Sequence, residues 1–365
     1  MKILLSGGGT GGHIYPALAL MRRIKVIQPD AEFLYVGTER GLESTIVPEA
    51  GIPFKSIEIQ GLKRSLSLEN FKTVYLMLTS ISKSKKIIKE FSPDVVIGTG
   101  GYVCAPVLYA ASRLNVPTII HEQNSVAGVT NKFLARFVDK IGICFEDVRN
   151  DFATYDNKVV YTGNPRAQEV VQLTEVASLE KYGLRNDLPT ALIFGGSRGA
   201  EKINQSVIDA LPFFSGKAYQ LILVTGEIHY GKIKKQIDTL ATDTTNIAVV
   251  PYVSDMPALF RKIAVVACRS GATTLTELTA LGLPSILIPS PYVTDNHQLK
   301  NAESLANNNA AVIIEENTLT GERLFNELDD LLTDQAKRDD MSKQAKELGV
   351  PDAADRLWAV IQSIV

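Results

Sequence analysis

A run of five glycines that ends in histidine is the part of the sequence with the clearest capacity for chemistry. It follows a short apolar strand and stands where a helix is expected to begin, in the segment Ser6-Gly7-Gly8-Gly9-Thr10-Gly11-Gly12-His13. Glycine lets a ligand approach the main chain, and the first turn of a helix offers unpaired N–H groups and a partial positive charge. The segment is therefore suited to bind a phosphate or an oxyanion, with the imidazole of His13 beside it.

The same glycines also fit the dinucleotide pattern G-x-G-x-x-G through Gly7, Gly9 and Gly12. A dinucleotide site requires an acidic residue about 20 positions further on, at the end of the second strand, to bind the ribose. The expected second strand, residues 32–36, runs into Gly-Thr, and the nearest acid, Glu39, lies in the loop beyond. From these residues alone an NAD or FAD site and a merely tight turn remain alternatives.

Apolar β-rich segments alternate with helical patterns from end to end, which predicts parallel sheets in two doubly wound α/β domains. The pattern restarts after Gly163-Asn164-Pro165, so we place the boundary between residues 1–164 and 165–344. We expect a helix near 169–182 and another from about 200. The expected strands are 2–6, 32–36, 94–98, 117–121, 140–144, 158–162, 189–194, 219–224, 246–250, 263–267, 284–288 and 310–314.

Four glycine-rich junctions between strand and helix stand out, at residues 7–13, 98–102, 195–199 and 269–274. In doubly wound sheets the ligand binds beyond the carboxyl ends of the strands, where such junctions lie. One glycine-rich turn is common. Four at corresponding edges of two domains indicate a cleft that binds more than one phosphate-bearing group.

The junction after residue 268 indicates a nucleoside diphosphate site. Ser270 and Gly271 open a helix whose second turn carries Glu277, so that amides could bind a diphosphate and the carboxylate could accept hydrogen bonds from ribose hydroxyls. The alternative is that Glu277 only favours its helix N-terminus, by about 0.3–1 kcal/mol. The polar loop Asp295-Asn296-His297-Gln298 is a candidate contact for sugar hydroxyls.

The sequence gives no indication of a metal or another cofactor. It lacks Asp-x-Asp, and its three cysteines and four histidines show no metal-ligand spacing. Phosphate charge would instead be neutralised by helix N-termini and by Arg166 or Arg269. We expect the cysteines to be reduced and mostly buried.

Two residues are candidates for a general base, which typically contributes 10²–10⁴-fold to a rate. His13 stands at a helix N-terminus, where the helix dipole disfavours the imidazolium. Glu122, in His121-Glu122-Gln123-Asn124, ends another strand of the first domain. The alternatives are that His13 caps or packs, and that Glu122 orients neighbouring loops.

The net charge of −2 disfavours a nucleic-acid binder. No stretch of about 18 apolar residues and no signal segment is present, so we expect a cytosolic protein. A basic segment over residues 60–90 has two interpretations, a solvated helix face or a surface for anionic lipid, where each basic residue contributes about 1 kcal/mol. Its basic residues are Lys63, Arg64, Lys72, Lys83, Lys85, Lys86 and Lys89.

Taken in order, these motifs resemble the MurG family, bacterial UDP-N-acetylglucosamine transferases that convert lipid I to lipid II in peptidoglycan synthesis. The resemblance spans essentially the whole chain and is carried by residues 8–13, 100–102, 121–124, 163–166, 195–197 and 269–277. It implies a GT-B fold, with two facing Rossmann-like domains and a deep interdomain cleft. It also implies that the C-terminal segment, residues 345–365 with a helix at about 352–363, packs back on the first domain.

The resemblance implies an inverting, metal-independent transfer of N-acetylglucosamine from UDP-GlcNAc to the 4-hydroxyl of muramic acid on undecaprenyl-linked lipid I. The first domain would bind the acceptor and the inner leaflet of an anionic membrane, on the cytoplasmic face, with cell-wall synthesis and division proteins as further partners. Val253 would read uracil through its backbone. The implied substrate contacts are Thr10, Gly11, Gly12, Gly100, Gly101, Tyr102, Asn124, Asn131, Arg166, Ser197, Asn204, Val253, Arg269, Ser270, Gly271, Ala272, Thr273, Thr274, Glu277, His297 and Gln298.

The sequence departs from the family pattern at two places. The family often has Gln-Gln where this chain has His297-Gln298, which leaves open which of the two contacts the sugar. The apolar patch expected at residues 72–82 is interrupted by polar residues, so membrane docking would depend more on charge or on partner proteins. The alternative functions are a GT-B sugar-nucleotide epimerase, a dinucleotide-dependent oxidoreductase and a non-catalytic binder of nucleotide sugars.

Overall fold

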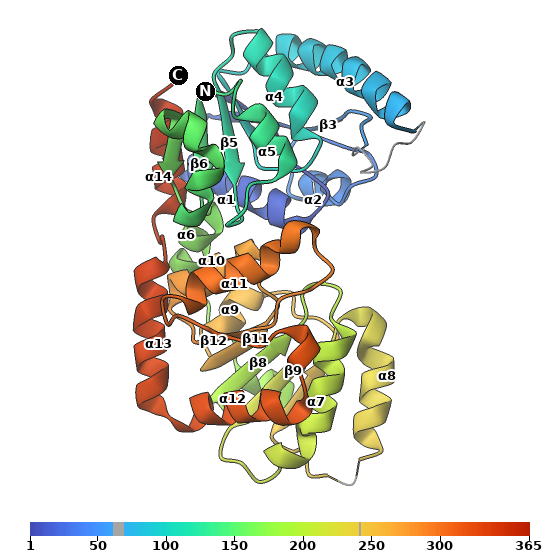
Figure 1. Cartoon of the computed structure of the whole chain (residues 1–365), viewed down its shortest axis with the longest axis vertical. Helices are drawn as coiled ribbons and strands as arrows, with labels where there is room; N and C mark the ends of the chain where they lie inside the picture. Colours follow the sequence, from blue (N-terminus) through green and yellow to red (C-terminus); the bar gives the residue numbers. More distant parts are fainter. Residues whose placement is uncertain (61–68, 241) are drawn as a thin grey trace. The chain divides into compact units, whose positions relative to one another are not determined.

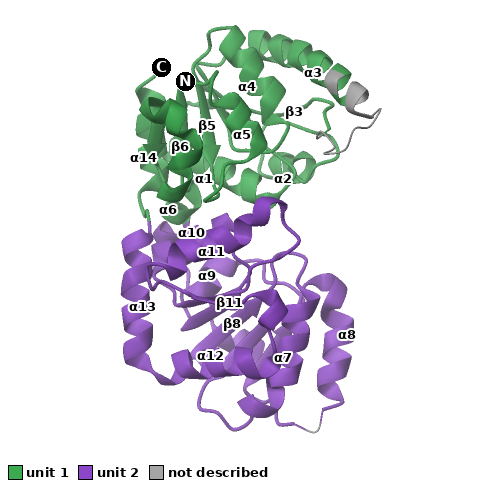
Figure 2. Cartoon of the chain, viewed as in Figure 1, with its two compact units in different colours: residues 1–169, 350–365 green, residues 170–349 purple. Residues whose placement is uncertain are grey.

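The computed structural model describes residues 1–60, 69–240 and 242–365 and divides the chain into two units (Figure 2). Unit 1 comprises Met1–Glu169 and Val350–Val365, and unit 2 comprises Val170–Gly349. The divisions therefore fall at 169 and 350, where we had expected 164 and 345. The first division falls within α6 (Pro165–Gln172), because Glu169 pairs with Arg22 of unit 1 whereas Arg261 of unit 2 donates to the carbonyls of Val170 and Val171.

Unit 1 is built on a sheet of seven parallel strands in the order β3-β2-β1-β4-β5-β6-β7. Alternate side chains point to opposite faces, so that Ile3 and Leu5 enter one core cluster and Leu4 enters the other. The strands are β1 (Lys2–Ser6), β2 (Glu32–Gly37), β3 (Phe54–Ser56), β4 (Val95–Gly98), β5 (Thr118–Glu122), β6 (Lys140–Ile143) and β7 (Val159–Tyr161).

Helices cover both faces of this sheet. The C-terminal helix α14 (Ala353–Gln362) packs beside α1 (Gly11–Ile27) (Figure 1). Asp355 on α14 accepts two hydrogen bonds from the guanidinium of Arg23 on α1, at 2.6 and 2.9 Å. The remaining helices are α2 (Glu43–Glu49), α3 (Glu69–Phe91), α4 (Cys104–Arg113), α5 (Val129–Leu134) and a 3-10 segment (Glu146–Lys158).

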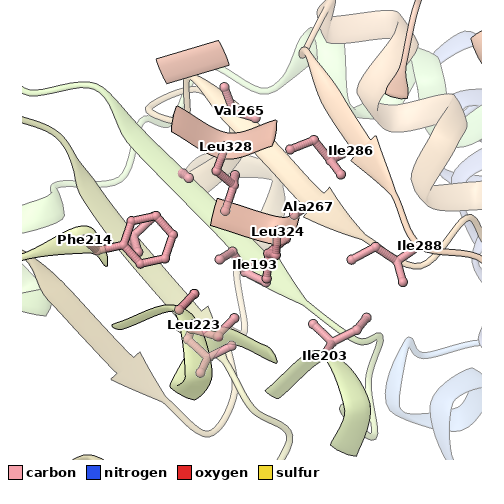
Figure 3. Close-up of a cluster of buried hydrophobic side chains, with 14 of the residues drawn as sticks. Ile193, Ile203, Phe214, Leu223, Val265, Ala267, Ile286, Ile288, Leu324 and Leu328 are labelled. Carbon is pink, nitrogen blue, oxygen red and sulfur yellow. The ribbon is translucent and has the colours of Figure 1, made fainter. Parts of the chain in front are cut away.

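Unit 2 repeats the design with six parallel strands in the order β10-β9-β8-β11-β12-β13. Figure 3 shows Ile193, Leu223 and Leu324 directed into one of its apolar clusters. The strands are β8 (Thr190–Phe194), β9 (Gln220–Val224), β10 (Ile247–Val250), β11 (Val265–Cys268), β12 (Ser285–Leu287) and β13 (Val312–Ile313). The helices are α7 (Glu201–Phe214), α8 (Glu227–Asp238), α9 (Met256–Phe260), α10 (Ala272–Leu281), α11 (His297–Ala306), α12 (Gly321–Thr333) and α13 (Gln335–Leu348).

The predicted pair of doubly wound parallel sheets is confirmed, and each expected strand is present within a residue or two at its ends. The predicted helix at 169–182 is wrong. Helix α6 already begins at Pro165, because proline suits the first helical position, and residues 179–182 form only a short 3-10 turn that ends at Gly183 with φ 75°. All three cysteines are free and buried, as expected.

Candidate active site

The glycine-rich junctions lie at the point in each sheet where the strand order reverses. In unit 1 this point is between β1 and β4, and in unit 2 it is between β8 and β11. Residues 7–13 and 98–102 follow the first pair of strands, and residues 195–199 and 269–274 follow the second. Because ligands of doubly wound sheets bind at this reversal, each unit has one well-placed candidate site.

The two junctions of unit 1 are in direct contact. The Gly8 amide donates a hydrogen bond to the Gly100 carbonyl at 3.2 Å. A Cβ at Gly101, which has a φ of 86°, would lie 2.5 Å from the Gly8 carbonyl oxygen. Glycine at 101 therefore allows the two loops to approach closely.

The Gly101→Ala variant should lose about 1–3 kcal/mol of unfolding free energy, from the positive φ and the clash with Gly8. Gly51→Ala is the matched control, because Gly51 has a φ of 75° with open space around its Cβ position. Chemical denaturation of both variants measures the loss of unfolding free energy, and the difference between them is the cost of the clash with Gly8 beyond the cost of the positive φ. Equal losses in the two variants would contradict the close contact between the loops.

His13 is held in one orientation on the third residue of α1. Its Nδ1 lies 2.7 Å from the Gly8 carbonyl oxygen, which can only accept, so Nδ1 carries the hydrogen. The ring lies against Gly100, where a Cβ would be 2.6 Å from Cδ2 and 2.9 Å from Nε2 of His13. In this tautomer Nε2 has a free lone pair and can accept a proton.

The start of α1 beside His13 has the features of an anion site. Thr10 is the N-cap residue, is exposed and makes no capping hydrogen bond with its side chain. The amides of Gly11 and Gly12 are therefore not capped by Thr10, and they carry the positive end of the helix dipole.

Arg166 lies on the same side of unit 1 as the start of α1. Its guanidinium is 5.9 Å from the ring centroid of Tyr15, and that ring covers Gly11. Arg166 also pairs with Glu169, so part of its charge is already balanced within the protein.

Glu122 is buried and fully engaged in hydrogen bonds. Its Oε1 accepts from the Asn124 amide at 3.1 Å and from the Asn124 side chain at 3.3 Å. Its Oε2 accepts from the Gly128 amide at 3.0 Å and from the Asn131 side chain at 2.8 Å. These bonds favour the interpretation that Glu122 shapes the loop after β5 rather than accepting a proton from a substrate.

His121 links the end of β5 to residue 163. Its Nε2 donates to the Gly163 carbonyl at 2.9 Å, and its Nδ1 accepts from the Gln123 side chain at 2.9 Å. Burial lowers the pKa of His121 to about 4, so the ring is neutral at physiological pH. It holds two loops and is not available to a substrate.

In unit 2 a cavity of about 710 Å³ opens beside the reversal between β8 and β11. Two of the predicted contacts, Arg269 and Gln298, line it. The lining also includes residues that sequence reasoning missed. The full lining is Gly195, Gly199, Ala200, Glu201, Lys202, Gln205, Arg269, Ser290, Tyr292, Gln298 and Glu316.

Arg269 is largely buried and forms an ion pair with Glu316. Its Nη1 donates to the carbonyls of Ile288 and Pro289, at 3.1 Å each. The guanidinium therefore holds the loop after β12 and has a carboxylate partner inside the protein. We had expected it to be a candidate for neutralising phosphate, but the sequence did not indicate that Glu316 would be its partner.

The start of α10 offers a second helix N-terminus. Gly271 is its N-cap, in extended conformation with no capping side chain, and a Cβ there would meet open space. The amides of residues 272–274 follow it, and Glu277 is buried one turn further on. The Ser270 hydroxyl donates to the Gln298 carbonyl at 2.7 Å, so it fastens the neighbouring loop.

The turn before α11 presents His297 and Gln298 differently. Asp295 and Asn296 both have positive φ, 54° and 51°, a strained pair of the kind found at functional loops. Gln298 lines the cavity and accepts from the Ser290 amide with Oε1 at 2.9 Å, whereas His297 donates to the Thr294 carbonyl at 2.8 Å. This geometry favours Gln298 as the residue that faces a sugar.

The remaining predicted contacts are spread over both units. In unit 1, Tyr102 is exposed, and Asn131 is buried against Glu122. In unit 2, Ser197 is exposed on the loop after β8 and Val253 is buried after β10. Asn204 is buried and donates to the Thr225 carbonyl at 3.0 Å.

Comparison with known proteins agrees with this arrangement over the whole chain. Residues 3–143 match the glycosyltransferase family 28 N-terminal domain, and residues 190–357 match the glycosyltransferase family 28 C-terminal domain. The chain is 56% identical, over all of both chains, to UDP-N-acetylglucosamine--N-acetylmuramyl-(pentapeptide) pyrophosphoryl-undecaprenol N-acetylglucosamine transferase from Listeria monocytogenes serotype 4b.

Solved structures show the same fold. MurG from Acinetobacter baumannii superposes with a TM-score of 0.79 at 28% identity, covering 99% of each chain. A putative UDP-N-acetylglucosamine 2-epimerase from Listeria monocytogenes superposes with a TM-score of 0.74 at 15% identity, covering 99% of this chain and 96% of the other. The second likeness concerns the fold alone.

Proposed function

The chain belongs to glycosyltransferase family 28, and on that premise we propose that it transfers N-acetylglucosamine from UDP-GlcNAc to undecaprenyl-pyrophosphoryl-MurNAc-pentapeptide (lipid I), giving lipid II. The observation that carries this proposal is the full-length identity to transferases of that name. The oriented His13 and the two helix N-termini supply the parts that the reaction needs.

We assign the acceptor to unit 1 and the donor to unit 2. In this scheme Nε2 of His13 takes the proton of the MurNAc 4-hydroxyl as its oxygen attacks C1 of N-acetylglucosamine. The bond between C1 and the diphosphate oxygen breaks, UDP leaves, and the configuration at C1 inverts. The amides at the start of α10 stabilise the charge that develops on the leaving diphosphate.

The donor contacts follow from the same scheme. Glu277 accepts hydrogen bonds from the ribose, and the backbone at Val253 reads the uracil. We assign Gln298 to the sugar because it lines the cavity; since its Oε1 accepts from the Ser290 amide, its NH2 group is the part that would donate to a sugar hydroxyl. Ser197 and Asn204 stay as proposed donor contacts in unit 2, and Arg166 of unit 1 stays as a proposed contact for phosphate.

Acceptor-dependent release of UDP tests the reaction. A coupled assay with UDP-GlcNAc should show UDP only when lipid I is added. An epimerase would convert UDP-GlcNAc to its epimer without releasing a stoichiometric amount of UDP and without needing lipid. Conversion of UDP-GlcNAc to its epimer, without lipid and without stoichiometric release of UDP, would overturn the transferase assignment.

We also propose a peripheral position on the cytoplasmic face of the membrane, through α3. Tyr75 and Leu78 are 65% and 64% exposed, and Lys85 and Lys89 follow at spacings that place them on the same helix face.

Lys63, Arg64 and the Lys72 side chain lie outside the described residues. Among the described helices, none is long and apolar enough to cross a membrane. Cell-wall synthesis and division proteins stay as proposed partners of this surface.

Replacing both Tyr75 and Leu78 by Ser should weaken binding to vesicles of anionic phospholipid by about 100-fold, because burying each side chain contributes about 1.5 kcal/mol. Ile228→Ser is the control, since Ile228 is 70% exposed on unit 2. Vesicle sedimentation measures both variants. Equal binding of the two variants would remove α3 from the contact surface.

A further inference from the structure

Glu43, the first residue of α2, is a buried carboxylate with three hydrogen-bond donors around it. Its Oε1 accepts from the Thr38 amide at 3.0 Å and from the Thr38 hydroxyl at 2.7 Å. Its Oε2 accepts from the Gly9 amide at 3.1 Å. Neither the glycine pattern nor the resemblance to a known family singled this residue out.

The surrounding chain leaves room for this carboxyl group by using glycine at three positions. A Cβ at Gly8 would lie 2.4 Å from Oε1 of Glu43, and one at Gly41 would lie 2.1 Å from Oε2. A Cβ at Gly37 would lie 2.5 Å from Cγ of Glu43. Such distances are too short for real Cβ atoms, so both the glycine-rich loop at Gly8 and the segment from Gly37 to Gly41 are fitted around the glutamate.

One peptide group connects Glu43 to His13. The carbonyl of Gly8 and the amide of Gly9 belong to the same planar unit. Its N–H donates to Glu43 at 3.1 Å, and its C=O accepts from Nδ1 of His13 at 2.7 Å. A carboxylate bonded to the N–H polarises the peptide and makes its carbonyl a stronger acceptor.

We propose that Glu43 is a positioning residue for His13, acting through the peptide group between Gly8 and Gly9. It fixes the plane of that peptide, and with it the orientation and the Nδ1–H tautomer of the ring. This inference rests on the proposed role of His13 as the base. The arrangement resembles the carboxylate that orients a catalytic histidine in hydrolases, with a peptide group inserted between the two.

Two other titratable groups near Glu43, Cys104 and Tyr35, are neutral at physiological pH. Burial raises the pKa of Cys104 to about 12, and burial also raises the pKa of Tyr35. Glu43 is therefore the group that acts on the Gly8–Gly9 peptide, through its hydrogen bond from the Gly9 N–H.

The test is Glu43→Gln, which keeps the shape of the side chain but has only one oxygen to accept from the donors of Thr38 on one side and Gly9 on the other. We expect kcat to fall by about 10-fold or more, with KM for UDP-GlcNAc within about 2-fold, because the donor is assigned to unit 2. Glu39→Gln is the matched control, since Glu39 lies in the same loop, is exposed and accepts a hydrogen bond from the Ser56 hydroxyl.

A double-mutant cycle with His13→Ala distinguishes positioning from a purely structural role. If Glu43 acts through His13, Glu43→Gln should change kcat little when His13 is already absent. The same loss of kcat in both backgrounds, or no loss in either, would overturn the proposal. Normal turnover of His13→Ala alone would instead overturn the base assignment.

The tautomer of His13 gives an independent readout if Glu43→Gln does not fold. Glu43→Asp keeps the charge but withdraws the carboxylate by about one bond length of 1.5 Å. We expect ¹⁵N NMR to show the Nδ1–H tautomer of His13 in the native protein and a mixture of tautomers in Glu43→Asp, with an intermediate kcat. An unchanged tautomer and an unchanged kcat in Glu43→Asp would overturn the proposal.

Discussion

The His13→Ala variant should turn over about 10²–10⁴-fold more slowly than the native enzyme, while its affinity for UDP changes by no more than a few-fold. The loss follows from the geometry in unit 1. Nδ1 of His13 is anchored on the Gly8 carbonyl at 2.7 Å, so that Nε2 is the atom that would accept the proton in the proposed reaction. UDP affinity is preserved because the nucleotide is assigned to unit 2.

His13→Asn is the matched variant for this prediction. An asparagine amide can donate to the Gly8 carbonyl in place of Nδ1, but it has no basic nitrogen. Its turnover should therefore be as low as that of His13→Ala, with stability closer to that of the native protein. Steady-state kinetics and isothermal titration with UDP measure the two quantities. Near-native turnover of His13→Asn would show that His13 only holds the loop.

The Glu122→Gln variant should lose about 2–4 kcal/mol of unfolding free energy, with turnover of the folded fraction within about 10-fold of native. The carboxylate accepts four hydrogen bonds, from Asn124, Gly128 and Asn131. An amide group supplies one oxygen only and directs its own N–H groups at two of these donors. The loop after β5 would therefore be poorly held.

Urea denaturation measures the loss, and Glu146→Gln is the control. Glu146 is exposed and pairs with Arg149, so its replacement should cost less than about 1 kcal/mol. A Glu122→Gln protein of native stability that turns over more than about 10²-fold more slowly would make Glu122 the base. That result, together with an active His13→Ala, would reverse the roles we assign.

The two parallel sheets could be predicted from the sequence because the residue patterns typical of strands, turns and helices follow one another in a regular order. Buried apolar strands such as 190–194 are followed by glycines at the junctions, and the alternation with helical patterns specifies parallel sheets. Strand β3 was missed because its three residues, Phe54–Ser56, are too few to show a period. The start of α6 was missed because Pro165 was taken as a break, whereas it occupies the first helical position.

The glycine-rich junctions were predicted, but the side chains within the protein that pair with or pack against their residues were not. Pairing of Arg269 with Glu316 joins residues 47 positions apart, and no local pattern encodes it. The carboxyl group of Glu43 contacts Gly8 and Gly9, two glycines whose sequence pattern predicts ligand binding. A glycine selected for contact with a ligand and one selected for contact with a buried side chain look the same in a sequence.

The most direct test of the function is the fate of radiolabelled sugar. Native enzyme incubated with UDP-GlcNAc labelled in the sugar and with lipid I should transfer the label to a butanol-soluble lipid, in an amount equal to the UDP released. Omission of lipid I should leave the label in the aqueous phase as unchanged UDP-GlcNAc. Label recovered only as free sugar or as an epimer, with lipid I present, would contradict the assignment of this chain as the transferase that makes lipid II.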